Sequence, residues 1–270
     1  MAKKINILDA SAKKTGDLAL PAQFDEFVRP DLIARSVLSL QSRARQAYGS
    51  DPRAGMRHSS KLSKRRRKYR GSYGFGISRV NRKIHTRRGT RFYWVGTFSP
   101  QTKGGRRSHA PKAEKDFGQK INAKENRKAI RSAMAASVDP AVVAERGHKV
   151  PTGFPFALDN SFEGLQKTSD LQNALLALGL DEELQRASVK NVRAGRGKSR
   201  GRKYKKAKGP LIVVSQDCPL LKSAANVAGV DVALCSAVNA ELLAPGADAG
   251  RLTLWTQAAV EKIAGEKLFA

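Results

Sequence analysis

The sequence predicts an α/β protein with a single doubly wound, mostly parallel sheet, into which a long basic loop is inserted. Strand-like apolar runs alternate with amphipathic helical patterns along the second half of the chain, which favours right-handed crossovers between parallel strands. The net charge of +28 over 270 residues is confined to two stretches. The 181 residues outside those stretches are enough to bury one hydrophobic core.

The first elements are short strands, followed by a helix. Strands are expected at residues 4–8 and 17–20. A helix is expected from about 31 to 47, because Pro30 suits a first helical turn and the apolar residues that follow have helical spacing. These apolar residues are Ile33, Val37, Leu40 and Ala44.

A second helix is predicted to begin near Asn122. Glu125 follows three residues later, and this pair has the pattern of a capping box, in which each side chain bonds the other residue's backbone. The buried stripe of this helix is expected to consist of Ile130, Ala133, Met134 and Val138.

The second half of the chain alternates strands and helices. After a strand at 155–158, a helix at about 169–178 should end at Gly179, a residue type that favours the left-handed C-cap. A short helix with acids in its first turn opens at 181, and the apolar run 211–214 predicts a strand buried on both faces. Further elements are expected as a helix at 220–228, a strand at 230–235, a helix at 238–243, a strand at 252–255 and a helix at 257–264.

The positive charge lies in two attachments to a nearly neutral body. Residues 43–112 carry 21 Lys or Arg and one acid, Asp51, and residues 190–208 carry ten and no acid. The other 181 residues hold 20 basic and 22 acidic side chains. We therefore predict one α/β domain over 1–270, with an inserted RNA-penetrating loop at about 49–118 and a second RNA-binding segment at about 190–208.

The aromatic residues gather in the first basic stretch, which holds eight of the seventeen in the chain. Basic side chains neutralise phosphates, while aromatic rings and Arg planes stack on unpaired bases. Two cysteines cannot staple a secreted scaffold of this length, and no apolar run is long enough for a membrane span or a signal peptide. A cytoplasmic protein that orders on RNA is expected.

Motifs for cofactors and metals fail on inspection. The Gly-rich runs at 71–76 and 195–201 follow no apolar strand, as a dinucleotide fingerprint requires. Gly197-Lys198-Ser199 resembles the end of a phosphate-binding loop, but Val192 stands where that loop needs its first glycine. Cys218 and Cys235 lie beside apolar strands and are expected in the core. No cofactor, metal site or catalytic group is predicted.

Four stretches together resemble a known family. They are HAPKAEK at 109–115, KINAKENRKAIRSAMAA at 120–136, RAGRGKSRGRKYKK at 193–206 and GPLIVV at 209–214. In this order, after a basic and aromatic loop, they are similar to the universal L-four family of large-subunit ribosomal proteins, in its archaeal and eukaryotic branch. The long C-terminal extension of eukaryotic members is missing, so the archaeal type is expected.

The resemblance implies a structural role without enzymatic activity. Family members place the globular domain on the exterior of the large subunit, while the long loop penetrates the ribosomal RNA and helps line the nascent-peptide exit tunnel. The implied partners are large-subunit ribosomal RNA, neighbouring ribosomal proteins including the L-twenty-two family protein, and the nascent peptide, with no membrane. The implied localisation is the cytoplasmic ribosome.

The loop tip departs from the family pattern at one position. Residues 79–82 occupy the place of an Arg-Ile/Val-Pro-Arg run, and Asn81 replaces the proline. The residues that follow are bulkier than the Gly-rich tip of relatives, which predicts a lining more prone to stacking. The residues expected to face the tunnel are Arg79, Asn81, Arg82, Arg87, Arg88 and Arg91.

The candidate RNA-binding residues combine phosphate-neutralising cations with stacking rings. In the first basic stretch, 43–112, they are Arg43, Arg45, Arg53, Arg57, Lys61, Lys64, Arg65, Arg66, Arg67, Lys68, Arg70, Tyr73, Arg79, Arg82, Lys83, Arg87, Arg88, Arg91, Phe92, Trp94, Lys103, Arg106 and Arg107. In the second segment they are Arg193, Arg196, Lys198, Arg200, Arg202, Lys203, Tyr204, Lys205 and Lys206.

Three alternatives stay open on sequence grounds. An RNA-modifying enzyme with basic arms would need a catalytic group or cofactor in its body. A free RNA chaperone or regulatory RNA binder would show the same charge pattern without a ribosome. The basic run at 64–68 could be a nuclear localisation signal, or it could simply be a phosphate-binding patch.

Overall fold

The computed structural model describes residues 3–68, 71–88 and 91–270, without the side chains of residues 84–94. The chain divides into two compact units. One, here called the body, comprises residues Met1–Ala44 and Gly118–Ala270. The other, here called the arm, is Arg45–Phe117.

A mixed six-stranded sheet forms the centre of the body, with strand order β10-β9-β11-β6-β1-β2. All neighbours pair in parallel except β1 and β2, which pair antiparallel at one edge. The strands are β1 (Lys4–Leu8), β2 (Lys14–Ala19), β6 (Phe156–Leu158), β9 (Leu211–Val214), β10 (Asp231–Leu234) and β11 (Thr253–Thr256). The predicted α/β class with a mostly parallel sheet is confirmed.

Alternate side chains of the central strands enter two separate cores. In β9, Leu211 and Val213 belong to one apolar cluster, whereas Ile212 and Val214 belong to the other. Because successive residues of a strand point to opposite faces, a continuous apolar run must be covered on both sides. All four residues of β9 are fully buried, as the sequence predicts for a central parallel strand.

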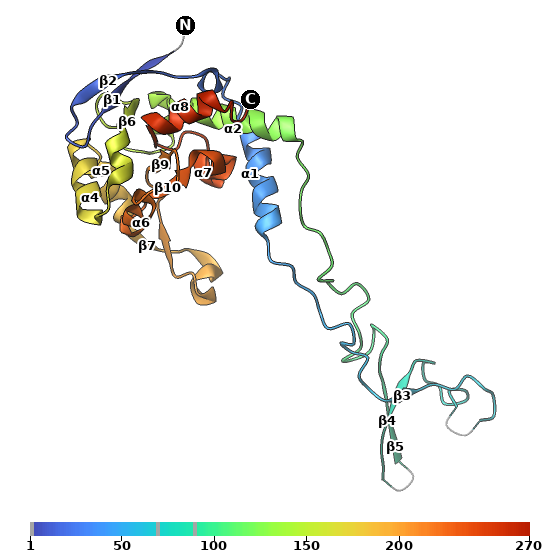
Figure 1. Ribbon diagram of the computed structural model, residues 1–270. Coiled ribbons are helices and arrows are strands. Elements are labelled where there is room, and N and C mark those ends of the chain that lie inside the picture. Colours follow the sequence, from blue (N-terminus) through green and yellow to red (C-terminus); the bar gives the residue numbers. More distant parts are fainter. Residues whose placement is uncertain (1–2, 69–70, 89–90) are drawn as a thin grey trace. The chain divides into compact units, whose positions relative to one another are not determined.

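Helices cover both faces of the sheet (Figure 1). Side chains that enter the first core come from α1 (Pro30–Ala44), α2 (Ala123–Ser137), α7 (Ala240–Leu243) and α8 (Gln257–Gly265). Those that enter the second come from α3 (Pro140–Glu145), α4 (Thr168–Ala177), α5 (Asp181–Ser188) and α6 (Leu220–Ser223). The β6–β9 and β9–β10 connections place α4, α5 and α6 on one face, whereas the β10–β11 connection places α7 on the other, so the sheet is doubly wound.

Local signals end several helices where the sequence predicts. Asn122 and Glu125 form the capping box at the start of α2, and the Asn122 amide donates to the Glu125 carboxylate at 3.3 Å. Gly179 follows α4 with φ of +76°, a conformation that other residue types adopt only with strain.

Other boundaries differ from the prediction. Helix α1 ends at Ala44, three residues early, and the expected helix at 220–228 is a single turn followed by a 3₁₀ turn at Ala224–Asn226. Helix α3 has no counterpart in the prediction, although its Asp139 cap and Pro140 are standard start signals. Cys235 is buried as expected, while Cys218 is only partly buried. Within the described residues, no helix is both long enough and apolar enough to cross a membrane.

Both basic stretches contain strands that the sequence analysis does not predict. In the arm, β3 (Ser60–Lys61), β4 (Arg82–Arg88) and β5 (Arg91–Gly96) form an antiparallel sheet. In the body, β7 (Lys190–Val192) pairs with β8 (Tyr204–Lys206), and we call residues 190–208 the hairpin. Repeated Lys and Arg obscure the pattern, but the aromatic and β-branched residues of β5 favour a strand.

Candidate nucleic-acid interface

The two limbs of the arm leave the body at neighbouring points. The Ser39 hydroxyl donates to the Gln119 carbonyl at 2.6 Å, and the Gln119 amide donates to the Ser42 hydroxyl at 2.9 Å. These bonds tie the last turn of α1 to the segment just before α2. The arm is therefore an insertion whose ends are already held together by the body.

The base of the arm is held by backbone pairing and a stack of rings. The Ser50 amide donates to the Pro111 carbonyl at 3.0 Å across the two limbs. Tyr48 and Phe117 stack with ring centroids 5.7 Å apart. The Arg45 guanidinium lies 4.2 Å from the Phe117 centroid, which is cation–π distance. Arg45, predicted to bind RNA, therefore also has a partner within the arm.

A second arginine–aromatic cluster lies farther along the arm. The Arg79 guanidinium lies 5.1 Å from the Tyr73 ring centroid and donates to the Tyr73 hydroxyl at 3.1 Å. Arg66 lies 5.9 Å from the same ring. Tyr73 is exposed, so the cluster offers a ring and two guanidinium groups that can stack on bases and contact phosphates.

None of the residues predicted in the first basic stretch that has a described side chain is buried. Those that are exposed are Arg43 at the end of α1, Arg45, Arg53, Arg57, Lys61, Lys64, Arg65, Arg66, Arg67, Lys68, Tyr73, Arg79, Lys103 and Arg107. Those that are partly buried are Asn81, Arg82, Lys83 and Arg106. Arg70 lies outside the described residues, as do the side chains of Arg87, Arg88, Arg91, Phe92 and Trp94.

The hairpin has a face of mixed lysine and apolar character. Lys190 pairs with Lys206, and Val192 with Tyr204, so these four side chains share one face. The Lys190 ammonium lies 4.1 Å from the Tyr204 ring centroid. Val192 and Tyr204 are both exposed. This face combines cations with a surface that can cover a base or a ribose.

All nine hairpin residues predicted to bind RNA are exposed except Arg193, which is partly buried. The Arg193 side chain donates to the Arg202 carbonyl at 3.0 Å, so it braces the hairpin internally. Lys190 and Lys208 also belong to the hairpin but were not predicted as site residues. The charge count of the segment was the signal that could have included them.

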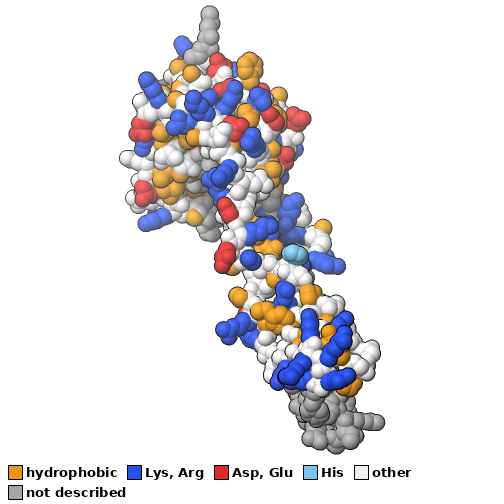
Figure 2. Space-filling view, turned by 90° about the vertical axis from the view of Figure 1, so that its right-hand side faces the viewer, with side chains coloured by type: hydrophobic (Ala, Val, Ile, Leu, Met, Phe, Trp, Pro, Cys, Tyr) orange, Lys and Arg blue, Asp and Glu red, His pale blue; other side chains and the backbone are white. Residues whose placement is uncertain are grey.

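The face of the molecule drawn in Figure 2 carries Lys and Arg side chains along the arm, with few acidic ones among them. On the body, the same view shows both signs of charge intermixed. Acids of the arm cannot neutralise its bases, since it holds 21 Lys and Arg against three Asp and Glu. Such a surface favours a polyanionic partner.

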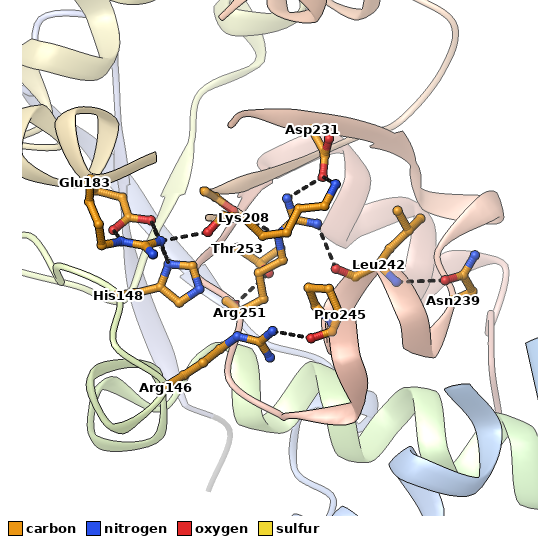
Figure 3. Close-up of polar contacts among 12 residues, drawn as sticks. Arg146, His148, Glu183, Lys208, Asp231, Asn239, Leu242, Pro245, Arg251 and Thr253 are labelled. Atoms are coloured by element: carbon orange, nitrogen blue, oxygen red, sulfur yellow. Dashed lines mark hydrogen bonds and ion pairs between the residues drawn. The ribbon is translucent and has the colours of Figure 1, made fainter. Parts of the chain in front are cut away.

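A buried ionic cluster lies where the hairpin joins the body (Figure 3). Glu183 of α5 has no exposed side-chain surface and accepts hydrogen bonds from the Arg186 guanidinium at 2.6 and 2.8 Å. His148 Nδ1 lies 2.7 Å from the same carboxylate, and the Lys149 amide donates to it at 3.0 Å. Burial alone would raise the pKa of Glu183, but the hydrogen bonds from Arg186, His148 and the Lys149 backbone outweigh it and lower the pKa to about 2.

A buried arginine lies in the same region. The Arg251 side chain is 1% exposed and donates to Asp231 Oδ2 at 2.6 Å. Lys208 of the hairpin donates to the same oxygen at 3.0 Å. Burial would raise the pKa of Asp231, but the hydrogen bonds from Arg251 and Lys208 lower it. Sequence reasoning missed this cluster because its members are far apart in the chain and follow no motif.

Acid is expected to weaken the body through Glu183. Because its pKa is about 4.5 when unfolded and about 2 when folded, its contribution is complete above pH 4.5 and disappears as pH falls towards 2. The contribution is about 3 kcal/mol. Urea unfolding followed by circular dichroism at several pH values should show a shallower acid dependence for Glu183→Gln than for the wild type. The exposed neighbour variant Glu182→Gln should retain the wild-type profile, and equal profiles for all three proteins would contradict the prediction.

The sequence pattern of the ribosomal protein L4/L1 family matches residues 18–266, which is most of the body and the entire arm. The chain belongs to the ribosomal protein L4/L1 family. This confirms the resemblance predicted from the four sequence stretches. Membership of this family of ribosomal proteins also supports the prediction that the chain is no enzyme.

Archaeal members of the L4/L1 family align with this chain from end to end. The protein of Nanoarchaeum equitans named large ribosomal subunit protein uL4 is 46% identical over 267 residues, covering 98% of this chain and 99% of the relative. Proteins of the same name from Methanococcoides burtonii and Halobacterium salinarum are 45% and 42% identical, covering 96% and 97% of this chain and 97% and 99% of the relatives. The archaeal type expected from the sequence is therefore confirmed.

Proposed function

We propose that this chain is a structural component of the large ribosomal subunit that binds ribosomal RNA. The observation that carries the proposal is the separation of charge: a nearly neutral folded body bears an arm and a hairpin rich in exposed cations. The names of its archaeal relatives support the choice of the large subunit.

In this proposal the chain is one α/β domain that carries two RNA-binding attachments. The body anchors on the exterior of the subunit, and the insertion at about 49–118 penetrates the RNA to help line the nascent-peptide exit tunnel, beside the L-twenty-two family protein. Its limbs are held together at their base, so the insertion reaches out and returns at one point of the body. The segment at about 190–208 grips a separate RNA surface.

The predicted site residues have two tasks in this proposal. Exposed Arg and Lys neutralise phosphates where RNA segments crowd together, and this contribution weakens as salt rises because bound counterions are released. Rings such as Tyr73 and Tyr204 stack on bases or cover riboses. The tip residues Arg79, Asn81 and Arg82, with Arg87, Arg88 and Arg91, are proposed to face the tunnel.

Sedimentation of cell lysate tests the assembly. The chain should sediment with the large subunit at moderate salt and be released only at high salt. Recovery in the soluble fraction at moderate salt would favour a free RNA chaperone. An RNA-modifying enzyme would be favoured by two results together. The chain would be released from the subunit at moderate salt, and calorimetry would show saturable binding of adenosylmethionine or a nucleotide.

Replacing three hairpin lysines tests the hairpin's role. The variant Lys203→Ala/Lys205→Ala/Lys206→Ala is expected to bind protein-free large-subunit ribosomal RNA more weakly. Binding should also become less sensitive to salt. The magnitude of the negative slope of log affinity against log salt should decrease by about 2–3, since each phosphate contact contributes 0.7–0.9. A filter-binding titration at several salt concentrations measures this.

The matched control removes the same charge from the body. The variant Lys3→Ala/Lys4→Ala/Lys13→Ala replaces three exposed lysines near β1 and β2. It should leave the slope within about 0.5 of the wild-type value, because these lysines lie outside the proposed contact surfaces. Equal salt slopes for the two triple variants would contradict the assignment of RNA contacts to the hairpin.

A further inference from the structure

The returning limb of the hairpin is fixed to the body by two arginines (Figure 3). The Arg186 guanidinium donates to the Lys208 carbonyl at 2.7 Å, and Arg251 Nε donates to the Gly209 carbonyl at 2.9 Å. Arg186 belongs to α5 and Arg251 lies two residues before β11, so the two anchors come from different parts of the body. Two consecutive peptide units are thus held where the chain re-enters the body.

Each arginine is itself oriented by a carboxylate. Glu183 holds Arg186 through two hydrogen bonds, and Asp231 holds Arg251 through one. Arg251 also donates to the Leu242 carbonyl at 3.0 Å, so its guanidinium is fixed on three sides. A planar guanidinium held in this way can aim its remaining donors at one backbone position.

The backbone around this point is closely packed. The Gly209 amide donates to the Gly229 carbonyl at 3.0 Å. A Cβ atom placed on Gly209 would lie 2.8 Å from that carbonyl oxygen, and one placed on Gly229 would lie 2.5 Å from the Ala187 Cβ. Any side chain at either glycine would push the returning limb away from α5. The end of the hairpin therefore has little freedom to move.

The outgoing limb is held differently. In the part of the chain that the structure describes, the hydrogen bonds between body side chains and the hairpin involve Lys208, on the returning limb. Its carbonyl accepts from Arg186, and its ammonium donates to Asp231. The outgoing limb is bound through its ladder with β8 and through the Arg193 amide, which donates to the Lys203 carbonyl at 2.8 Å. The direction of the hairpin thus depends on the anchors at Lys208 and Gly209.

Buried ion pairs add little net stability, because the desolvation of both charges opposes their attraction. Their better-supported role is to select one conformation among several. A fully buried Glu183 and a nearly fully buried Arg251 at the root of the hairpin suit this role. We propose that Arg186 and Arg251 are positioning residues that fix the direction of the hairpin, so that it meets RNA already oriented. This inference rests on the proposed RNA-binding function.

The test uses Arg-to-Lys substitutions, which keep the net charge of the chain but remove the planar guanidinium groups. In Arg186→Lys/Arg251→Lys, each ammonium still neutralises its carboxylate but cannot also span to the Lys208 or Gly209 carbonyl. Spin labels are attached at Ala194→Cys in the hairpin and Ala264→Cys in α8, both exposed, with Cys218→Ser preventing labelling of the third accessible thiol. Pulsed electron resonance then measures the distribution of distances between hairpin and body.

The wild-type chain should give one narrow distribution, and the double variant a broader one. The affinity of the double variant for protein-free large-subunit ribosomal RNA should fall by about tenfold, because orienting the hairpin then opposes binding. Affinity for poly(U) should stay within about twofold, since the number of charges is unchanged. If the two arginines only stabilised the body, the double variant would not lose affinity for ribosomal RNA while keeping its affinity for poly(U).

Arg146→Lys is the matched control. Arg146 is a partly buried arginine of the same region that donates to the Pro245 carbonyl at 2.5 Å and has no hydrogen bond to the hairpin among the described residues. Its variant should keep the narrow distribution and the RNA preference. If the double variant fails to fold, as judged by circular dichroism, Arg186→Lys alone is measured, because it leaves the more deeply buried Arg251 in place.

Three outcomes would overturn the proposal: a broad distribution in the wild type, an unchanged distribution in the folded variant, or equal broadening by Arg146→Lys. A failure of the proposed function looks different. In that case the wild-type chain would not prefer ribosomal RNA over poly(U), while the distance distributions would still report whether the arginines fix the hairpin.

Discussion

Replacing residues 45–117 with a short Gly-Ser linker is expected to abolish tight binding to large-subunit ribosomal RNA while leaving the body folded. The segment carries 21 Lys and Arg against three acids, so most phosphate contacts should be lost with it. At roughly 100 mM salt, affinity should fall by about a thousandfold or more, and the salt slope by about half. Filter binding to protein-free RNA at several salt concentrations measures both quantities.

The geometry of the body permits this deletion. Because the Ser42 hydroxyl accepts a hydrogen bond from the Gln119 amide, a linker of about six residues can join α1 to α2 without strain. Circular dichroism at 222 nm serves as the control, since the helices in the described part of the chain all lie in the body. A folded deletion variant with the wild-type salt slope would show that the arm is not the principal RNA-binding element.

Glu183→Leu is expected to lower the free energy of unfolding of the body by about 3–5 kcal/mol at pH 7. The substitution removes the buried acceptor shared by Arg186, His148 and the Lys149 amide, while Arg186 retains its hydrogen bond to the Lys208 carbonyl. This loss of stability arises because removing one member of a buried ionic cluster leaves the opposite charges uncompensated. It does not measure the net free energy of any one contact. Urea unfolding followed by circular dichroism measures it.

The neighbouring variant Glu182→Leu provides the comparison. Glu182 belongs to the same helix and is exposed, so its replacement should change the free energy of unfolding by no more than about 0.5 kcal/mol. If the two variants were equally stable, the prediction that Glu183 stabilises the body would be wrong.

The alternation of apolar patterns was sufficient to predict the α/β class of the body and its central strands. Residues 211–214 are apolar without interruption, and only a strand covered on both faces buries all four side chains. Asn122, Glu125 and Gly179 marked helix ends correctly, because capping depends on residues only a few positions apart. Short elements such as α3 were missed, since six residues give too little periodicity to detect.

The strands of the basic stretches could not be predicted in the same way. Lysines such as Lys190 and Lys206 lie on the same face as Val192 and Tyr204, so the hairpin has no alternation of apolar and polar faces. Its pairing depends on cross-strand contacts and on its anchorage to the body. Its charge, in contrast, can be counted directly in the sequence.

By itself, the sequence determined the α/β class, the family and the division into a nearly neutral body and two basic attachments. These follow from local periodicity, from charge counts and from motifs of adjacent residues. Only the tertiary structure decided that the Glu183–Arg186 pair and the Asp231–Arg251 pair meet the chain at Lys208 and Gly209, at the root of the hairpin. Side chains up to about seventy positions apart converge there because the sheet and α5 bring their backbones together, and local sequence patterns do not record such proximity.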